Sequence, residues 1–240
     1  VASVDEGAWY RPDHEGVDHG GCVGSYDERA KKITRSVGNL LLKSGLSFGI
    51  LGEKEHCDGN EVKALGEAGL FQYLAEQNIA QFKEIGAKKI ITLDPHAFNA
   101  FKKDYKELGA TFEVYHYSHI LAPLIQSKKI PLASYKARVT FHDPCYLGRH
   151  NGVYEAPRQI LKAIPGLELI EMQQNRANAL CCGGGGGNFF TDILGGGEDS
   201  PSRIRVRQAR ETGAPIIAVS CTQCAKILED AQKSETLTES

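Results

Sequence analysis

The chain has 240 residues, which is enough for one large hydrophobic core or two smaller ones, and its 41% hydrophobic content is typical of globular proteins. Its formal net charge of −2 gives no electrostatic case for nucleic-acid binding, and no apolar run approaches the ~18 residues of a membrane-spanning helix. Seven cysteines are an odd number for a secreted disulfide framework, so we expect a reducing cytoplasm, where closely spaced cysteines bind metal or react.

The first segment in chain order, residues 1–19, is expected to be an N-terminal arm. Its start, Val1-Ala2-Ser3-Val4-Asp5, has neither an initiator methionine nor the basic-then-apolar pattern of a signal peptide. We interpret it as a processed start or as the beginning of a fragment cut from a longer chain.

The first half, residues 20–130, alternates amphipathic and apolar segments. Strands are predicted at residues 48–51, 89–93 and 112–117, and helices at residues 28–42 and 69–85. Strands that alternate with helices indicate a parallel sheet covered on both faces. A polar, lysine-rich stretch at residues 126–136 is expected to separate this half from the second.

The second half, residues 131–240, continues the alternation. Strands are predicted at residues 138–143, 167–172 and 215–220, and helices at residues 155–163 and 201–212. Pro201 stands just inside the last of these helices, and Ser200 is its expected N-cap. The whole pattern predicts an α/β fold of two Rossmann-like halves with parallel sheets, related by a pseudo-two-fold internal duplication. In such sheets ligands bind at the carboxyl ends of the strands.

Five cysteines in the second half have the spacing of a metal-ligand set. Cys145 is followed after 35 residues by the adjacent pair Cys181-Cys182, and after 38 more by Cys221-x-x-Cys224. Thiolates are soft ligands that suit iron–sulfur clusters and zinc, and they also carry out redox chemistry. Because a tetrahedral zinc site needs fewer ligands, we favour an iron–sulfur cluster. Zinc, buried structural thiols and a metal-free CxxC redox pair remain as alternatives.

Glycines and a histidine flank these cysteines. The run at residues 183–187 is not followed by the Lys-Ser/Thr of a phosphate-binding loop, and its alternatives are a flexible linker or backbone that wraps a cluster. We favour the second, with the amides of Gly183 and Gly184 close to the cluster sulfides. His142, three residues before Cys145, either packs at a strand end or donates a proton or hydrogen bond near a reduced sulfur. It is the candidate catalytic residue.

The first half repeats this spacing with some of the thiols replaced. Cys22 is followed after 34 residues by Cys57-Asp58, and after 35 more by Asp94-x-x-Ala97, which indicates an internal duplication. The residues here that suit a second metal site, with zinc as the candidate ion, are Cys22, Cys57, Asp58, Asp94 and His96. We favour the alternative in which the two aspartates cap turns or helix starts.

In these residues the chain resembles the B/D-like family of heterodisulfide reductase subunits, whose cysteine-rich CCG domains come in pairs. Segments 142–149, 181–183 and 221–224 are similar to a complete CCG motif, and segments 21–27 and 94–99 are similar to a degenerate one. The resemblance implies that all five cysteines of the second half hold one noncubane [4Fe-4S] cluster. The first half lacks three thiols, and aspartate and alanine cannot replace thiolates on a cluster, so we expect no second one.

The resemblance implies an oxidoreductase subunit of a larger anaerobic redox complex, with disulfide- or thiol-linked electron transfer at its cluster. The implied partners are other redox subunits, linked to iron–sulfur, flavin or quinone groups, and a small-molecule or protein disulfide. One alternative is an electron relay without disulfide chemistry, and another is a zinc-binding scaffold. A cytoplasmic location is expected, with attachment to a membrane-associated complex as a variant of it.

Overall fold

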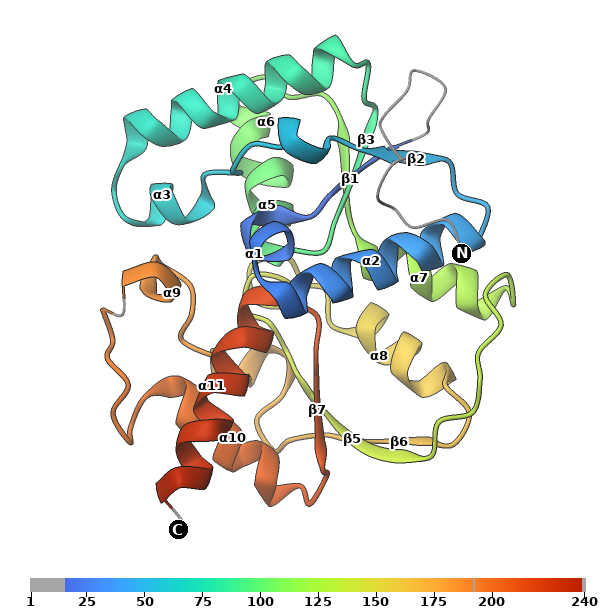
Figure 1. Ribbon diagram of the computed structural model, residues 1–240, viewed down its shortest axis with the longest axis vertical. Coiled ribbons are helices and arrows are strands. Elements are labelled where there is room, and N and C mark those ends of the chain that lie inside the picture. Colours follow the sequence, from blue (N-terminus) through green and yellow to red (C-terminus); the bar gives the residue numbers. More distant parts are fainter. Residues whose placement is uncertain (1–15, 192, 239–240) are drawn as a thin grey trace. The chain divides into compact units, whose positions relative to one another are not determined.

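The computed structural model describes residues 16–191 and 193–238, so residues 1–15 of the expected N-terminal arm lie outside the described part. The chain divides into two compact units, Val1–Pro131 (unit 1) and Leu132–Ser240 (unit 2). Each unit has its own parallel sheet with helices packed against it (Figure 1). The expected α/β fold with parallel sheets in two similar halves is confirmed.

Unit 1 is built on four parallel strands in the order β2-β1-β3-β4. Their bounds are Gly16–His19 for β1, Phe48–Ile50 for β2, Lys89–Thr92 for β3 and Glu113–His116 for β4. Strand β1 is central, and its last residue, His19, is paired with Thr92 at the end of β3. The segments that carry Cys22 and Asp94 therefore leave the sheet at the same edge.

Helices connect these strands. Their bounds are Gly21–Tyr26 (α1), Glu28–Lys43 (α2), Asn60–Ala64 (α3), Ala68–Glu84 (α4), Pro95–Asn99 (α5), Tyr105–Glu107 (α6) and Tyr117–Gln126 (α7). A 3₁₀ turn lies at Gly52–Lys54, and a π-helical turn lies at Ala100–Asp104. Helix α2 begins where it does because the Asp27 carboxylate accepts hydrogen bonds from the first free backbone N–H groups, those of Arg29 and Ala30.

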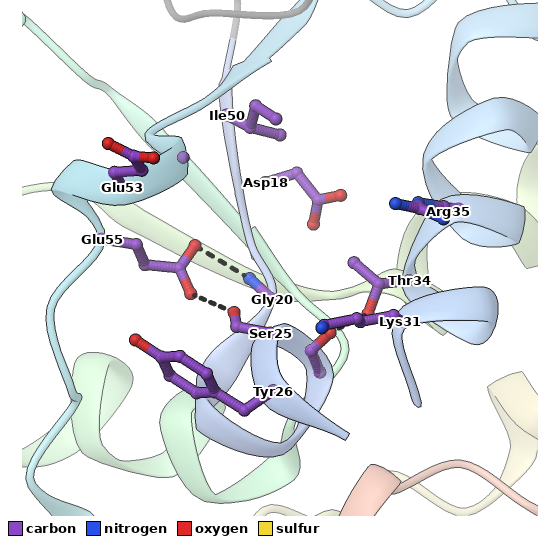
Figure 2. A pocket seen from close by; sticks show the side chains of 12 residues that line it. Asp18, Gly20, Ser25, Tyr26, Lys31, Thr34, Arg35, Ile50, Glu53 and Glu55 are labelled. Carbon is purple, nitrogen blue, oxygen red and sulfur yellow. Dashed lines mark hydrogen bonds between the residues drawn. The ribbon is translucent and has the colours of Figure 1, made fainter. Parts of the chain in front are cut away.

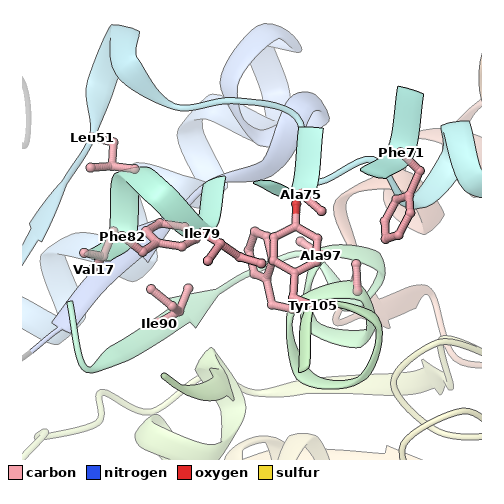
Figure 3. Packing of buried hydrophobic residues seen from close by; sticks show 11 residues of the cluster. Val17, Leu51, Phe71, Ala75, Ile79, Phe82, Ile90, Ala97 and Tyr105 are labelled. Carbon is pink, nitrogen blue, oxygen red and sulfur yellow. The ribbon is translucent and has the colours of Figure 1, made fainter. Parts of the chain in front are cut away.

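The core of unit 1 lies between α4 and the sheet (Figure 3). Helix α4 presents Ala75, Ile79 and Phe82 on one face, at the spacing of successive helical turns. These side chains belong to one buried cluster with Val17 of β1 and Ile90 of β3, so the apolar stripe of the helix covers the central strands. This packing holds the polar carboxyl ends of β1 and β3 in place.

Unit 2 has three parallel strands in the order β6-β5-β7. Their bounds are Ala137–His142 for β5, Leu167–Ile170 for β6 and Ile216–Val219 for β7. The helices of unit 2 are Glu155–Ala163 (α8), Asn188–Thr191 (α9), Pro201–Glu211 (α10) and Thr222–Thr238 (α11), with a 3₁₀ turn at Arg176–Asn178. His142 is paired with Val219, so the chain leaves β5 and β7 at the same edge of the sheet.

All six predicted strands are present with ends within two residues of the prediction, and the four predicted helices are α2, α4, α8 and α10. Two corrections are needed. Strand β1 was not predicted, because its residues were placed in the arm of residues 1–19; the structure places them at the centre of a sheet. Ser200 occupies the N-cap position of α10, but its side chain makes no capping hydrogen bond, and its hydroxyl instead lies 3.3 Å from the Ser202 hydroxyl.

Candidate metal centre

Two of the five predicted ligands follow strand β7. Cys221 directly precedes α11, and Cys224 lies in the first turn of that helix. The backbone N–H of Cys224 donates to Sγ of Cys221 over 3.4 Å, so the Cys221 sulfur caps the start of the helix. Both side chains are buried. The CxxC spacing thus places two sulfurs at one helix start, on the edge of the sheet where β5 also ends.

Cys145 follows the central strand β5 at this edge. The residue two positions before it, Asp143, is buried and receives two hydrogen bonds from Arg158, at 2.6 and 2.8 Å. Arg158, which is itself fully buried, also donates to both carboxylate oxygens of Glu171, at 2.7 and 2.9 Å. Bidentate pairs of this kind are geometrically restrictive. The loop that presents Cys145 is therefore held by α8 and by the segment after β6.

The adjacent pair Cys181-Cys182 is followed by two glycines, Gly183 and Gly184, at which a side chain would be strained or would clash. Gly183 has a φ of +83°, which only glycine adopts readily, and its N–H donates to Sγ of Cys181 over 3.3 Å. A Cβ on Gly184 would lie 2.9 Å from Cγ1 of Ile227 in α11 and 3.6 Å from Sγ of Cys182. The glycines thus allow the backbone to pass directly against α11 and the thiols, which supports the cluster-wrapping interpretation over a flexible linker.

Sulfur atoms from the three segments converge. Sγ of Cys145 lies 3.5 Å from Sγ of Cys181, and Sγ of Cys182 lies 3.3 Å from Sγ of Cys224. Hydrogen bonds from Cys145 and Cys182 lower the pKa of Cys181, whereas the hydrogen bond to Cys181, together with burial and the charges of Cys181, Cys182 and Cys221, raises the pKa of Cys145. All five predicted ligands therefore belong to one interacting group.

His142 lies beside these thiols. A ring nitrogen of His142 and the sulfurs of Cys182 and Cys224 lie within 4.8 Å of one another, and they are the only potential metal-binding group of three found in the described residues. Nε of Arg205 donates to Nδ1 of His142 over 3.1 Å. Burial and the Arg205 charge lower the pKa of His142 to about 3, so the ring is neutral near pH 7. A neutral ring with so low a pKa favours hydrogen bonding over proton donation as its role.

The donor set fits an iron–sulfur cluster. Five thiols exceed what one tetrahedral zinc ion needs, and two of them are adjacent in the chain. Two buried donors near them, Nε2 of His142 and Nη2 of Arg205, have no hydrogen-bond partner among the described residues. Buried donors without acceptors are rare and costly. Sulfide and thiolate sulfurs of a cluster accept such hydrogen bonds, so a bound cluster would supply the acceptors that these two donors lack.

Unit 1 brings its counterpart residues to the equivalent edge of its sheet, but in a different arrangement. The thiols of Cys22 and Cys57 are hydrogen-bonded to each other. Asp58 and Asp94 each accept a hydrogen bond from the backbone N–H two residues further on, at 2.8 and 2.9 Å, at the starts of α3 and α5. In the described part of the chain these residues form no group of three ligand atoms within 4.8 Å. The geometry favours the capping interpretation over a second metal site.

Carboxylates surround the histidines of unit 1. Burial and the charge of Asp94 raise the pKa of Asp58 to about 6. Nδ1 of His96 lies 2.7 Å from the carboxylate of Glu61. Burial acts to lower the pKa of His19, but neighbouring carboxylates outweigh it and raise this pKa. Unit 1 thus has a network of carboxylates and histidines at the place where unit 2 has most of its thiols.

A cavity of about 560 Å³ opens at the ends of β1 and β2 (Figure 2). Lys31 and Arg35 of α2 line one side of it, and Asp18 and Glu55 line the other. The Glu55 carboxylate is engaged by the N–H of Gly20 over 3.2 Å. Asp18 is buried, its Oδ1 has no hydrogen-bond partner among the described residues, and burial together with Glu55 raises its pKa to about 7.

Arg158 and Arg205 were not identified as functional from the sequence. Both lie on helices, where arginines usually face solvent, yet both are fully buried. A signal existed for Arg205: at about 100° per residue, Arg203, Arg207 and Arg210 fall on one face of α10, whereas Arg205 falls on the opposite face, so the four arginines cannot share one exposed face. The sequence held no comparable signal for Arg158.

Several known proteins are similar to this chain over most of its length. The family model of the CCG cysteine-rich domain matches residues 17–102 and 139–229. The chain is 44% identical over 224 residues to FadF of Bacillus subtilis, a probable iron–sulfur-binding oxidoreductase, and the match covers 90% of this chain and 30% of that protein. It is 37% identical over 228 residues to the EtfAB:quinone oxidoreductase of Syntrophomonas wolfei, which covers 92% of this chain and 32% of that protein. It is 35% identical over 254 residues to a subunit of the dihydromethanophenazine:CoB–CoM heterodisulfide reductase of Methanosarcina barkeri, which covers 98% of this chain and 60% of that protein.

The chain therefore spans between 30% and 60% of the length of these relatives. Within the described ranges, no helix has both the length and the apolar character needed to cross a membrane. One match of the family model falls in each unit, and the predicted resemblance to paired CCG domains is confirmed. The chain belongs to the CCG cysteine-rich domain family and contains two copies of that domain.

Proposed function

We propose that this chain is an iron–sulfur redox unit with one noncubane [4Fe-4S] cluster. Its ligands are the five cysteines of the second half, Cys145, Cys181, Cys182, Cys221 and Cys224. The observation that carries the proposal is the convergence of their sulfurs from three separate segments, with contacts of 3.5 and 3.3 Å between thiols of different segments. The name of the Bacillus subtilis relative, an iron–sulfur-binding oxidoreductase, supports the same assignment.

When bound, such a cluster accepts and delivers one electron at a time. The residues of the chain supply the environment. Cys182, Cys221 and Cys224 are buried, whereas Cys145 and Cys181 are partly exposed. The Gly183 N–H stabilises negative charge on the Cys181 sulfur. Electrons or a reacting sulfur atom would thus approach from the side of Cys145 and Cys181.

The role that we assign to this unit is disulfide- or thiol-linked electron transfer in a larger anaerobic redox complex. A relative that covers nearly the whole chain is part of a heterodisulfide reductase. The partners in this proposal are redox subunits with iron–sulfur, flavin or quinone groups, and a small-molecule or protein disulfide is the acceptor. Thiols in this number fit the reducing cytoplasm, and a membrane-associated complex is the proposed setting.

An electron relay without disulfide chemistry is the second candidate function. Two observations favour it. The first half keeps only two thiols, Cys22 and Cys57, at the positions of its motif, so a paired-cluster site for disulfide cleavage is incomplete. The name of another relative describes electron transfer from EtfAB to quinone. In this role the cluster passes electrons between partners and binds no substrate.

Electron paramagnetic resonance of the anaerobically purified, oxidised protein distinguishes these functions. The protein is titrated with a small thiol, and the alcohol of the same carbon skeleton is the control. A cluster signal that changes with the thiol but not with the alcohol supports disulfide-linked chemistry. A signal that is indifferent to both assigns the relay. A protein that binds zinc and no iron contradicts both redox functions and leaves the zinc scaffold.

A further inference from the structure

His142 is held by a buried arginine. Arg205 is fully buried on α10, and its Nε donates to Nδ1 of His142 over 3.1 Å. The guanidinium is itself anchored, since Nη1 donates to the carbonyl oxygen of Gln174 and to Oε1 of Gln208, each over 2.8 Å. Both contacts are short and come from different segments, so the Arg205 side chain has little freedom to turn away from the histidine.

This contact decides which ring nitrogen carries the proton. A guanidinium nitrogen can only donate, so Nδ1 must accept and cannot carry a hydrogen. In a neutral ring the hydrogen then resides on Nε2. Nε2 of His142 is buried and has no hydrogen-bond partner among the described residues. The result is an N–H group without an acceptor, on a ring that lies beside the sulfurs of Cys182 and Cys224.

The duplication supplies an internal comparison. His19 lies three residues before Cys22 and ends β1, just as His142 lies three residues before Cys145 and ends β5. Nε2 of His19 lies 3.3 Å from the carbonyl oxygen of His56, so this ring uses a different nitrogen. Glu55 lies 3.7 Å from the same Nε2. In unit 2 an arginine thus contacts the histidine at the strand end, whereas in unit 1 a carboxylate and a carbonyl oxygen contact the equivalent histidine.

We propose that Arg205 fixes the tautomer of His142 so that its Nε2–H donates a hydrogen bond to the sulfurs held at Cys182 and Cys224. His142 is then a donor to the cluster and not a metal ligand, and Arg205 is a positioning residue. This inference rests on the proposed iron–sulfur function. A hydrogen bond to cluster sulfur stabilises the more negative, reduced state and raises the reduction potential.

The first test reads the tautomer without any cluster. The cluster-free, reduced full-length protein is labelled with ¹⁵N-histidine, and two-bond correlations to the ring carbons identify the protonated nitrogen. We expect the Nε2–H form for His142 at pH 7, and loss of that preference in Arg205→Met, which has no donor, but not in Arg205→Lys. A His142 ring with its hydrogen on Nδ1 overturns the inference, and this result does not depend on whether the protein binds iron.

The second test measures the potential of the loaded protein by redox titration with paramagnetic resonance. We expect His142→Leu to keep its iron and to lose about tenfold in the ratio of reduced to oxidised cluster at a fixed ambient potential, which is about 59 mV for one electron. His142→Gln retains an amide donor and should shift less, and the matched variant His19→Leu should not shift. Two results overturn the assignment of His142 as a hydrogen-bond donor. One is a His142→Leu protein that folds fully but loses its iron, and the other is an equal shift of the potential in His142→Leu and His19→Leu.

Discussion

The guanidinium of Arg158 lies between the carboxylates of Glu171 and of Asp143, which is two residues before Cys145. It is fully buried and also lies 5.1 Å from the ring centre of Phe141. Removing one partner from a buried ion group leaves an uncompensated charge, which costs more than the group contributes when intact. The arginine therefore matters chiefly because it compensates the charge of Asp143, which is buried two residues before Cys145, a ligand in our proposal.

We expect Arg158→Met to lower the free energy of unfolding by about 3–5 kcal/mol, because it leaves the Asp143 carboxylate buried with the N–H of Arg176 but without its guanidinium partner. Urea denaturation under anaerobic conditions measures the change. The control is Arg138→Met, since the Arg138–Glu168 pair at 3.6 Å is largely exposed and should contribute less than about 1 kcal/mol. Equal effects of the two substitutions would contradict this account of Arg158.

The buried carboxyl of Asp18 makes the free energy of unfolding depend on pH. Its pKa is raised from 3.8 to about 7, so the carboxyl stabilises the fold when protonated, and this contribution is lost as the pH rises through 7. Asp18→Asn keeps the neutral form at every pH. We expect its gain in the free energy of unfolding at pH 8 to exceed its gain at pH 5.5 by about 2 kcal/mol.

Denaturation of wild type and Asp18→Asn at the two pH values tests this prediction. Glu53→Gln is the matched control, because Glu53 lines the same cavity but is exposed. A gain for Asp18→Asn that is the same at both pH values would show that the Asp18 carboxyl titrates as an ordinary exposed acid.

At this scale the thiols were predictable and the arginines were not. Thiolate chemistry restricts what five closely spaced cysteines can do, so their spacing alone indicated a ligand set. Arg158 and Arg205 acquire their roles only from their contacts with Asp143 and His142. The spacing of arginines on α10 sets Arg205 apart, but it does not show which residue that side chain contacts, and for Arg158 there was no signal at all.

At the scale of elements, the loop at residues 183–187 is positioned by its fit against α11. We expect Gly184→Ala to lower the free energy of unfolding by about 1–3 kcal/mol, because its Cβ would lie 2.9 Å from Ile227. The iron content should fall as well, since the same Cβ would lie 3.6 Å from the Cys182 sulfur.

Gly196→Ala is the control for this substitution, because a Cβ there meets nothing within 4 Å. Its effect should stay within about 0.5 kcal/mol, with unchanged iron content. Full iron content and stability in Gly184→Ala would mean that the loop moves away from α11 at little cost and that close approach is not what the glycine provides.

The elements also show where sequence patterns fail. Strands β3 and β7 contain consecutive apolar residues, β5 alternates apolar and polar residues, and all three were predicted. Strand β1 reads Gly-Val-Asp-His and offers only Val17 to the core. The other two residues at its carboxyl end, Asp18 and His19, are polar and yet buried, so hydrophobic periodicity could not identify this strand. Short helices such as α1 and α3 were missed for a related reason, since they are too short to show a period.

At the scale of the whole molecule, two copies of one domain have different chemistry at the same place in the fold. Unit 2 presents five thiols with a neutral histidine and a buried arginine, and unit 1 presents two thiols with carboxylates and a histidine of raised pKa. The chain corresponds to 30% of the Bacillus subtilis relative. The redox groups that would exchange electrons with the cluster are therefore part of the proposal alone.

Iron and acid-labile sulfide analysis of matched cysteine variants tests the central claim most directly. Cys181 and Cys57 are equivalent positions of the two copies, so Cys181→Ser and Cys57→Ser are compared with wild type after anaerobic purification. We predict about four irons and four sulfides per chain for wild type and for Cys57→Ser, and loss of the cluster in Cys181→Ser. About eight irons per chain, equal losses in the two variants, or zinc in place of iron would contradict a single cluster held by the second half.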